Sequence, residues 1–161
     1  MANPKLESRK ATSIAYIEHK GAYGEVPWGE YMEKLYGWAK EQKVMPGFFP
    51  MAICYDNPDE VPAKKCRSDI AITFKAFKGK AKATKGIKTK KLPAMKVVTL
   101  SHKGPGSEFG NTYAKIGHWV HEHGYEASAA PMEIYSKKPE VVKGVTIIYA
   151  KIMVPVKKRK K

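Results

Sequence analysis

The chain has 161 residues, of which 43% are hydrophobic and 28% charged, and its formal net charge is +15. This length suits a single domain with a buried core. No apolar run approaches the roughly 18 residues that a membrane-spanning helix needs. The first residues lack the apolar stretch of a signal peptide, so we expect a cytoplasmic protein. In that compartment Cys54 and Cys66 are expected to be thiols, not a disulfide.

The positive charge is concentrated in two segments. Residues 75–91 contain eight lysines and no acidic residue, and residues 157–161 are all basic. Outside these segments the acidic and basic residues nearly balance. Such runs are usually solvated, and they can hold a polyanion loosely by releasing counterions. The pattern predicts weak, non-specific nucleic-acid contact through the linker and the tail, because no recognition helix or base-stacking motif accompanies the charge.

The first half of the chain predicts a strand, a helix and two further strands. β-branched residues at 13–18 end in the turn His19-Lys20-Gly21, which is typical of a strand. Residues 28–43 place Tyr31, Leu35 and Trp38 on one stripe, which is typical of a helix packed on one side. The two later strands are predicted at 50–55 and 69–74.

The second half repeats the first. His19-Lys20-Gly21 recurs as His102-Lys103-Gly104 at an offset of 83, and an offset of 81 then pairs Trp38 with Trp119 and Ile53 with Ile134. Two tryptophans in register favour a tandem repeat over chance. The predicted elements of the second copy are a strand at 96–101, a helix at 108–123, and strands at 131–136 and 145–154.

The repeat predicts an α+β fold, a tandem duplication of a βαββ module with pseudo-twofold symmetry. The single domain would span residues 11–156, with repeat one at 11–77, a lysine-rich linker at 78–94, repeat two at 95–156, and a basic tail at 157–161. Strand alternation assigns Ile53 and Ile134 to the face under the helices and Glu133 to the opposite face. The helices would then cover one side of the sheets, leaving a ligand cleft on the other.

The motifs of both copies resemble the GyrI-like small-molecule-binding domains. Residues 14–21, 54–58 and 66–69 resemble the first copy of that fold, and residues 102–105 and 131–135 resemble the second. The resemblance implies a duplicated βαββ domain with a ligand cleft, here as a stand-alone member. The family that the chain resembles includes effector domains of multidrug-responsive regulators, a gyrase inhibitor, and hydrolases that open cyclopropane-bearing toxins.

Glu133 is the main candidate site residue, because the resemblance implies a pocket-facing glutamate on the middle strand of the second copy. A carboxylate among aromatic side chains is expected to have a raised pKa, and it could attract a cation or act as a general base. For the aromatic residues, packing in the core is as good an alternative as contact with a ligand. For Asp69, an ion pair with Arg67 is an equal alternative to a role in the site. The predicted ligand-binding set is Glu133, Tyr135, Trp119, Trp38, Tyr113, Tyr55, Tyr149 and Asp69.

A metal site is not predicted. His118, His121 and His123 cluster near the end of a helix, but their spacing is not that of the His-Glu-x-x-His zinc motif. A solvated helix end with imidazoles favoured by the helix dipole is the expected structure. No metal or other cofactor is expected on these grounds.

Three functions stay open on the sequence. The first is binding of a small, largely apolar organic compound, with or without positive charge, in a central cleft lined by aromatic residues and Glu133. The second is a hydrolase of strained, cyclopropane-bearing electrophiles in which Glu133 positions water. The third is a partner-binding protein of the gyrase-inhibitor type, helped by its basic tail.

Overall fold

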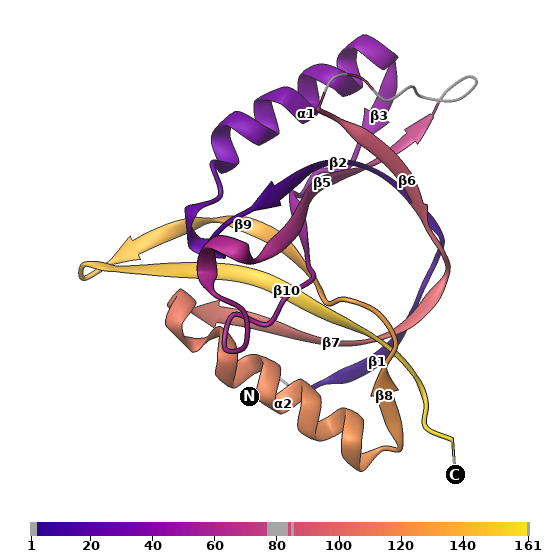
Figure 1. Cartoon of the computed structure of the whole chain (residues 1–161), viewed down its shortest axis with the longest axis vertical. Coiled ribbons are helices and arrows are strands. Elements are labelled where there is room, and N and C mark those ends of the chain that lie inside the picture. The colour runs from indigo at the N-terminus through magenta and orange to yellow at the C-terminus, as the bar shows by residue number, and fades with distance from the viewer. Residues whose placement is uncertain (1–2, 77–83, 85, 161) are drawn as a thin grey trace. The chain divides into compact units, whose positions relative to one another are not determined.

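A computed structural model describes residues 3–76, 84 and 86–160 (Figure 1). Residues 77–83 and 85, which belong to the lysine-rich segment, lie outside the described residues. The chain divides into two compact units, called here the 11–93 unit and the 94–161 unit, and the latter also includes residues 1–10. The described residues contain two α-helices and ten strands, and the strand pairings within each unit are antiparallel. The expected mixture of helices and strands is confirmed.

The 11–93 unit places one helix on a sheet. The strand order is β4-β5-β2-β6, and the short β3 also pairs with β5. Its elements are β2 (Thr12–Lys20), α1 (Trp28–Gln42), β3 (Val44–Pro46), β4 (Met51–Cys54), β5 (Arg67–Ala76) and β6 (Lys88–Leu92), with 3-10 turns at Tyr23–Glu25 and Ala63–Lys65.

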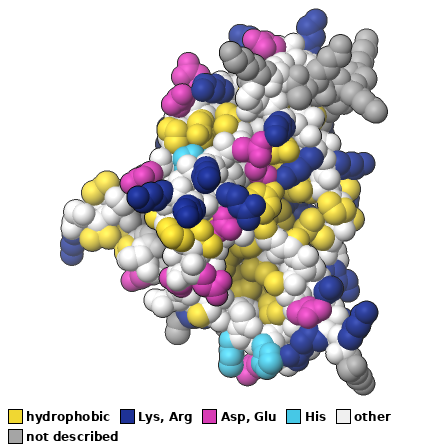
Figure 2. Space-filling view, viewed as in Figure 1, with side chains coloured by type: hydrophobic (Ala, Val, Ile, Leu, Met, Phe, Trp, Pro, Cys, Tyr) yellow, Lys and Arg dark blue, Asp and Glu magenta, His cyan; other side chains and the backbone are white. Residues whose placement is uncertain are grey.

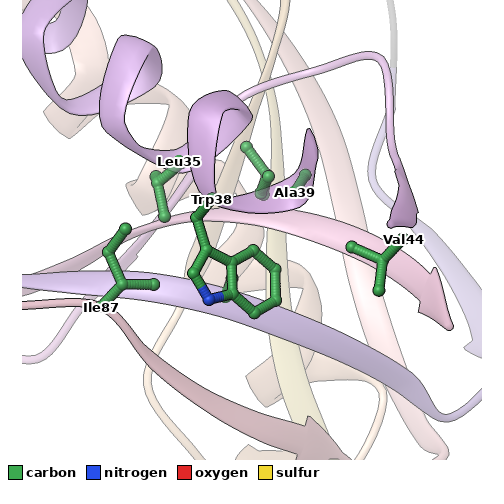
Figure 3. Close-up of a cluster of buried hydrophobic side chains, with 7 residues drawn as sticks. Leu35, Trp38, Ala39, Val44 and Ile87 are labelled. Atoms are coloured by element: carbon green, nitrogen blue, oxygen red, sulfur yellow. The ribbon is translucent and has the colours of Figure 1, made fainter. Parts of the chain in front are cut away.

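Helix α1 covers its sheet with an apolar stripe. Leu35, Trp38 and Ala39 are buried and pack on Ala15 and Ile72 of the sheet (Figure 3). The helix ends at Gln42 because the next residue adopts a left-handed conformation, which returns its N–H to the last-turn carbonyls. Sequence periodicity and the observed burial agree here.

The 94–161 unit has the same kind of layer arrangement. Its strand order is β1-β7-β10-β9, and the short β8 also pairs with β10. Its elements are β1 (Lys5–Arg9), β7 (Met95–Gly104), α2 (Phe109–Glu122), β8 (Tyr125–Ala127), β9 (Met132–Val142) and β10 (Val145–Lys158), with a 3-10 turn at Gly106–Glu108.

The β9–β10 hairpin is longer than the sequence predicts. Strand β9 continues through Pro139, and the chain turns at Lys143-Gly144, where φ is 51° and 79°. Two successive positive φ values are what a two-residue type I′ hairpin turn requires. Strands β1, β3, β6 and β8 were not predicted, and β6 lies within the segment interpreted as a linker.

Helix α2 packs on its own sheet. Ile116 and Val120 of the helix lie against Val98, Leu100 and Ile152 of β7 and β10. Both sheets thus bury an apolar face under a helix, as the predicted stripes require. Within the described residues, neither helix is long and apolar enough to cross a membrane.

The pairing register corrects the predicted faces of β4. Residues directly opposite each other in an antiparallel pair share a face of the sheet. Ala52 lies opposite Ile70, which shares a face with Ile72, two residues further along β5, and Ile72 packs under α1. Ile53, in contrast, lies opposite Asp69 on the other face. The placement of Ile53 beneath the helix is therefore wrong.

The same correction applies to β9. Glu133 lies opposite Ile152, which packs under α2, and Ile134 lies opposite Lys151 on the other face. Glu133 therefore faces the helix, not the uncovered side of the sheet. Alternation defines which residues share a face, but a one-residue change of register exchanges the two faces.

Candidate functional site

Glu133 is a buried carboxylate held by two phenols. Its side chain leaves β9 on the α2 side, and the residue is 8% exposed. The hydroxyl of Tyr113, on α2, donates to Oε2 at 2.5 Å, and the hydroxyl of Tyr135, on β9, donates to Oε1 at 2.6 Å. Burying a carboxylate is costly unless its oxygens accept hydrogen bonds. The two tyrosines therefore fix the carboxylate and help to offset its burial.

An apolar hollow lies beside this cluster and shares Tyr113 with it. Its volume is about 220 Å³. In the lower half of the view in Figure 2, hydrophobic side chains line a hollow near the histidine side chains. Gly117 contributes no side chain to the wall, and a Cβ built there would meet no atom within 4 Å. Its lining is Tyr113, Ile116, Gly117 and Val120 of α2, with Ala127, Ala129, Pro131 and Val154.

Asp69 belongs to a different cluster, in the 11–93 unit. The hydroxyl of Tyr55 donates to its Oδ2 at 2.5 Å, and Nζ of Lys90 donates to the same oxygen at 2.7 Å. The ammonium of Lys90 lies 4.4 Å from the ring centre of Tyr16. The alternative ion pair with Arg67 is not formed, since Arg67 pairs with Asp56 at 3.0 Å.

The protonation of this cluster follows from its contacts. Burial by itself lowers the pKa of Lys90, but hydrogen bonds with Asp69 and Tyr55 outweigh it and leave the pKa above its usual value. Burial raises the pKa of Tyr55, and its hydrogen bond to Asp69 adds to the effect. At neutral pH Lys90 is therefore an ammonium and Tyr55 a phenol, and neither is an activated nucleophile.

The remaining predicted site residues have other surroundings. Trp38 is 2% exposed and lies in the core under α1 (Figure 3). Its ring meets that of Phe74 edge to face, with centres 5.2 Å apart. Trp119 is half-buried and stacks on His123 with ring centres 3.9 Å apart. Tyr149 receives the ammonium of Lys137 over its ring. The predicted set thus separates into a Glu133 cluster, an Asp69 cluster and individually packed aromatics.

The histidines and the tail interact with each other and with their neighbours. His118 pairs with Glu122, and His121 accepts a hydrogen bond from Arg159, whose guanidinium also bonds the His121 carbonyl. In the part of the chain that the structure describes, no three His, Cys, Asp or Glu residues are arranged to hold a metal ion. Lys157 and Lys158 pair with β8, so the start of the tail is strand and not a free extension.

Sequence reasoning missed Gly117, Lys90 and Tyr16. Lys90 lay in the segment interpreted as a solvated linker, and the alternating Lys88-Thr89-Lys90 was the available sign of a strand. Gly117 could have been found from the sequence offset of 81, which matches it with Tyr36. Tyr16 needed the register of β2 with β6.

Comparison with known proteins now adds to this geometry. The chain matches the family described as the GyrI-like small molecule binding domain over residues 2–157. A search of curated protein sequences finds no match. All the solved structures compared below are less than 25% identical to the chain and support the fold.

The C-terminal domain of EcmrR is 17% identical, with a TM-score of 0.77 and 98% of both chains covered. A hydrolase encoded by lin2189 from Listeria innocua is 14% identical, with a TM-score of 0.72, covering 96% of this chain and 92% of that one. SAV2435 bound to tetraphenylphosphonium is 14% identical, with a TM-score of 0.56 and coverages of 97% and 94%.

Proposed function

Since the chain belongs to the family of GyrI-like small-molecule-binding domains, we propose that it binds a largely apolar organic cation at Glu133. The observation that carries this proposal is a buried carboxylate next to an apolar hollow, with Tyr113 common to both. A ligand with a positive centre and an aromatic or aliphatic group fits both parts. The tetraphenylphosphonium bound to SAV2435 belongs to that chemical class.

Each part of the site contributes differently to binding. The carboxylate supplies the charge that attracts a cation, and low local polarity strengthens that attraction relative to water. The rings of Tyr113 and Tyr135 offer faces on which a cation or a flat group can lie. Ile116, Val120 and Val154 supply apolar contact, which favours a ligand that leaves water readily.

The volume limits the part of a ligand that enters. Drug-sized ligands usually occupy pockets of about 300–1,000 Å³, and the hollow holds about 220 Å³. We therefore expect one aromatic or branched aliphatic group to enter, while the rest of a larger ligand stays at the opening. The missing side chain at Gly117 provides part of this room.

The test compares two glutamates of the same strand. Glu133→Gln keeps the shape and removes the charge, whereas Glu140→Gln makes the same change at an exposed ion pair with Lys137. Affinity for tetraphenylphosphonium, measured by calorimetry, should fall by about 1–3 kcal/mol in the first variant, the scale for losing a charged partner. It should stay unchanged in the second.

A neutral ligand provides the second comparison. Triphenylphosphine oxide has a similar apolar bulk without the full charge, so its affinity should change little between the parent and Glu133→Gln. Equal tetraphenylphosphonium affinity in the parent and in Glu133→Gln would contradict the assignment of Glu133 as the cation-binding group. A folded Glu133→Gln variant is expected, because the change relieves part of the burial cost of a charge.

Hydrolysis of a strained electrophile is a second candidate, favoured by the same carboxylate. Glu133 could accept a proton from water while the tyrosine hydroxyls orient the site. One protein of similar fold is named a hydrolase. Incubation with a cyclopropane-bearing alkylator, followed by mass spectrometry, distinguishes the functions: a water adduct that Glu133→Gln slows by ~10²-fold or more identifies an enzyme, and unchanged compound identifies a binding protein.

A weak contact with nucleic acid or a protein partner is proposed for the basic segments alone. Lys157 pairs with Glu126 and Arg159 bonds His121, which leaves few unengaged charges on the described tail. Any binding of DNA or RNA by the tail together with the lysines of 75–91 should be weak, insensitive to sequence, and strongly weakened by salt. Gel-shift assays at two salt concentrations check this, and tight binding after neutralising the tail and the lysines of 75–91 would contradict it.

We also propose that the two units are copies of one βαββ module. The proposal is supported by the pairing registers. Ile53 lies opposite Asp69 and Ile134 lies opposite Lys151, and the second pair follows the first by nearly the same number of residues on both strands. The same holds for Tyr16 opposite Ala71 and Thr99 opposite Met153. An experimental structure in which the helix and three strands of one module do not superpose on those of the other would contradict it.

A further inference from the structure

We propose that Tyr16, Tyr55 and Asp69 form a second cation site, specific for small organic ammonium ions, which Lys90 fills from within the chain. All four residues lie in the 11–93 unit, so the inference is independent of the function proposed for Glu133. A carboxylate between aromatic faces is the arrangement that recognises ammonium groups in proteins. Here a lysine of the same chain takes the place of such a ligand.

The contacts of the Lys90 ammonium resemble those of a bound ligand. It lies 4.4 Å from the ring centre of Tyr16 and 5.6 Å from that of Tyr55, within the range of cation–π attraction. It donates to Asp69 Oδ2 at 2.7 Å and to the Tyr55 hydroxyl at 2.9 Å. Asp69 is 5% exposed and is therefore a built, buried anion and not a surface charge.

The other unit has the matching ion pair without the aromatic residues. The offset of 83 matches Ile14 with Val97, so Glu7, which lies opposite Val97, takes the place of Lys90, which lies opposite Ile14. By the same comparison of strand pairs, Lys151 takes the place of Asp69. Lys151 donates to Glu7 at 3.1 Å, so the pair recurs with its charges exchanged.

The residues around the two ion pairs differ. Thr99 stands at the place of Tyr16, and Ser136 stands at the place of Tyr55 by the sequence offset. An ion pair at this place in the sheet therefore does not need aromatic neighbours. The two tyrosines beside Lys90 serve a further purpose, and stabilisation of an exchangeable cation is the purpose that their ring faces fit.

Lys90 is placed so that it can leave the site. It projects from β6, which among the described residues pairs only with β2, and its side chain is 33% exposed. A lysine side chain has four rotatable bonds, and moving it away returns the ammonium to water. An external ammonium ion must compete with a tethered one, whose effective concentration is in the millimolar range. The site should therefore bind weakly until Lys90 is removed.

The experiment removes the internal cation at each of the two matching places. Lys90→Met keeps most of the length of the side chain and vacates the site, whereas Lys151→Met removes the ammonium where Thr99 and Ser136 stand at the positions of the two tyrosines. Benzyltrimethylammonium is titrated into each protein and followed by the NMR signals of the tyrosine rings. We expect Lys90→Met to bind at least ten-fold more tightly than the parent, and Lys151→Met to bind no more tightly than the parent.

Two double variants identify the site that binds. Lys90→Met with Asp69→Asn should lose the gain, because the carboxylate is part of the proposed site. Lys90→Met with Glu133→Gln should keep it, which separates this inference from the function proposed for Glu133. No gain in Lys90→Met, an equal gain in Lys151→Met, or a gain that disappears with Glu133→Gln would each overturn the proposal.

A measurement on the unaltered protein covers the case in which Lys90→Met does not fold. Displacement of Lys90 by benzyltrimethylammonium should make its amine more reactive, so acylation at Lys90, measured by mass spectrometry, should rise with the concentration of the added ion. Acylation at Lys151 should stay constant. A Lys90 reactivity that does not respond to saturating ligand would overturn the proposal by itself.

Discussion

The two helix–sheet interfaces use the same arrangement and differ in how completely it is filled. Under α1, Trp38 is buried in the core, and Tyr36 reaches across to donate to the Gly47 carbonyl at 3.1 Å. Under α2, Trp119 is only half-buried, and Gly117 stands at the place of Tyr36. One interface serves stability, and the other leaves a hollow beside a carboxylate. The hollow therefore lies where α2 lacks the side chain that α1 has at the matching position.

The largest contrast is expected between the two tryptophans. Trp38→Ala should lower the free energy of unfolding by about 3–5 kcal/mol, the usual cost of removing a buried aromatic residue. Trp119→Ala should cost less, about 1–2 kcal/mol, because its ring is half-buried at the edge of the apolar cluster, where it stacks on His123 and Tyr125. Urea denaturation followed by circular dichroism measures both. Equal losses would mean that the two interfaces are equally packed.

The next effect comes from filling the hollow. Gly117→Tyr places in α2 the residue that the first copy has, and we expect tetraphenylphosphonium affinity to fall by about 1–2 kcal/mol as apolar contact is lost. Gly110→Tyr adds the same ring elsewhere on α2, where a Cβ also meets open space, and serves as the matched control. Undiminished affinity in Gly117→Tyr would place the ligand outside the hollow.

The smallest effect concerns the hydroxyl that spans the other interface. Tyr36→Phe keeps the ring and removes the hydrogen bond to Gly47, so the free energy of unfolding should fall by about 1 kcal/mol. Tyr23→Phe is the comparison, because the hydroxyl of Tyr23 donates to the Asp56 carbonyl. Thermal denaturation of both variants shows whether the loss of stability is specific to Tyr36 or follows the loss of any such tyrosine hydrogen bond. No change in Tyr36→Phe would mean that the ring alone fills the interface.

The helices and the long strands could be predicted because they are locally encoded. The stripe containing Leu35 and Trp38 has the helical period, and the β-branched segments at 13–18 and 145–154 correspond to β2 and β10. The faces of β4 and β9 could not be predicted, because alternation is symmetric and only the pairing partner decides which parity lies under the helix. Glu133 was predicted as a site residue through family resemblance, and the side of the sheet predicted for it was wrong.

The Asp69 cluster shows a second reason for incomplete prediction. Its members come from β2, β4–β5 and β6, and their meeting depends on three strand registers that no local pattern contains. A lysine among many lysines also carries no signal of its own. The hollow under α2 was missed because a glycine in a helix is usually interpreted only as a cost in stability, and not as a source of space beside the helix.

Strand β1 has a consequence for the order in which the chain acquires its structure. It precedes the other described strands in the chain, yet it pairs with β7, whose Val97 lies about ninety residues after its partner Glu7. Each strand of the 11–93 unit, by contrast, pairs with at least one other strand of that unit, and α1 packs on them. Contacts distant in sequence form slowly, and domains fold in the order of synthesis. The N-terminal residues should therefore stay unpaired while the middle of the chain folds, and in a nascent chain they should become protected from protease only after β7 has been made.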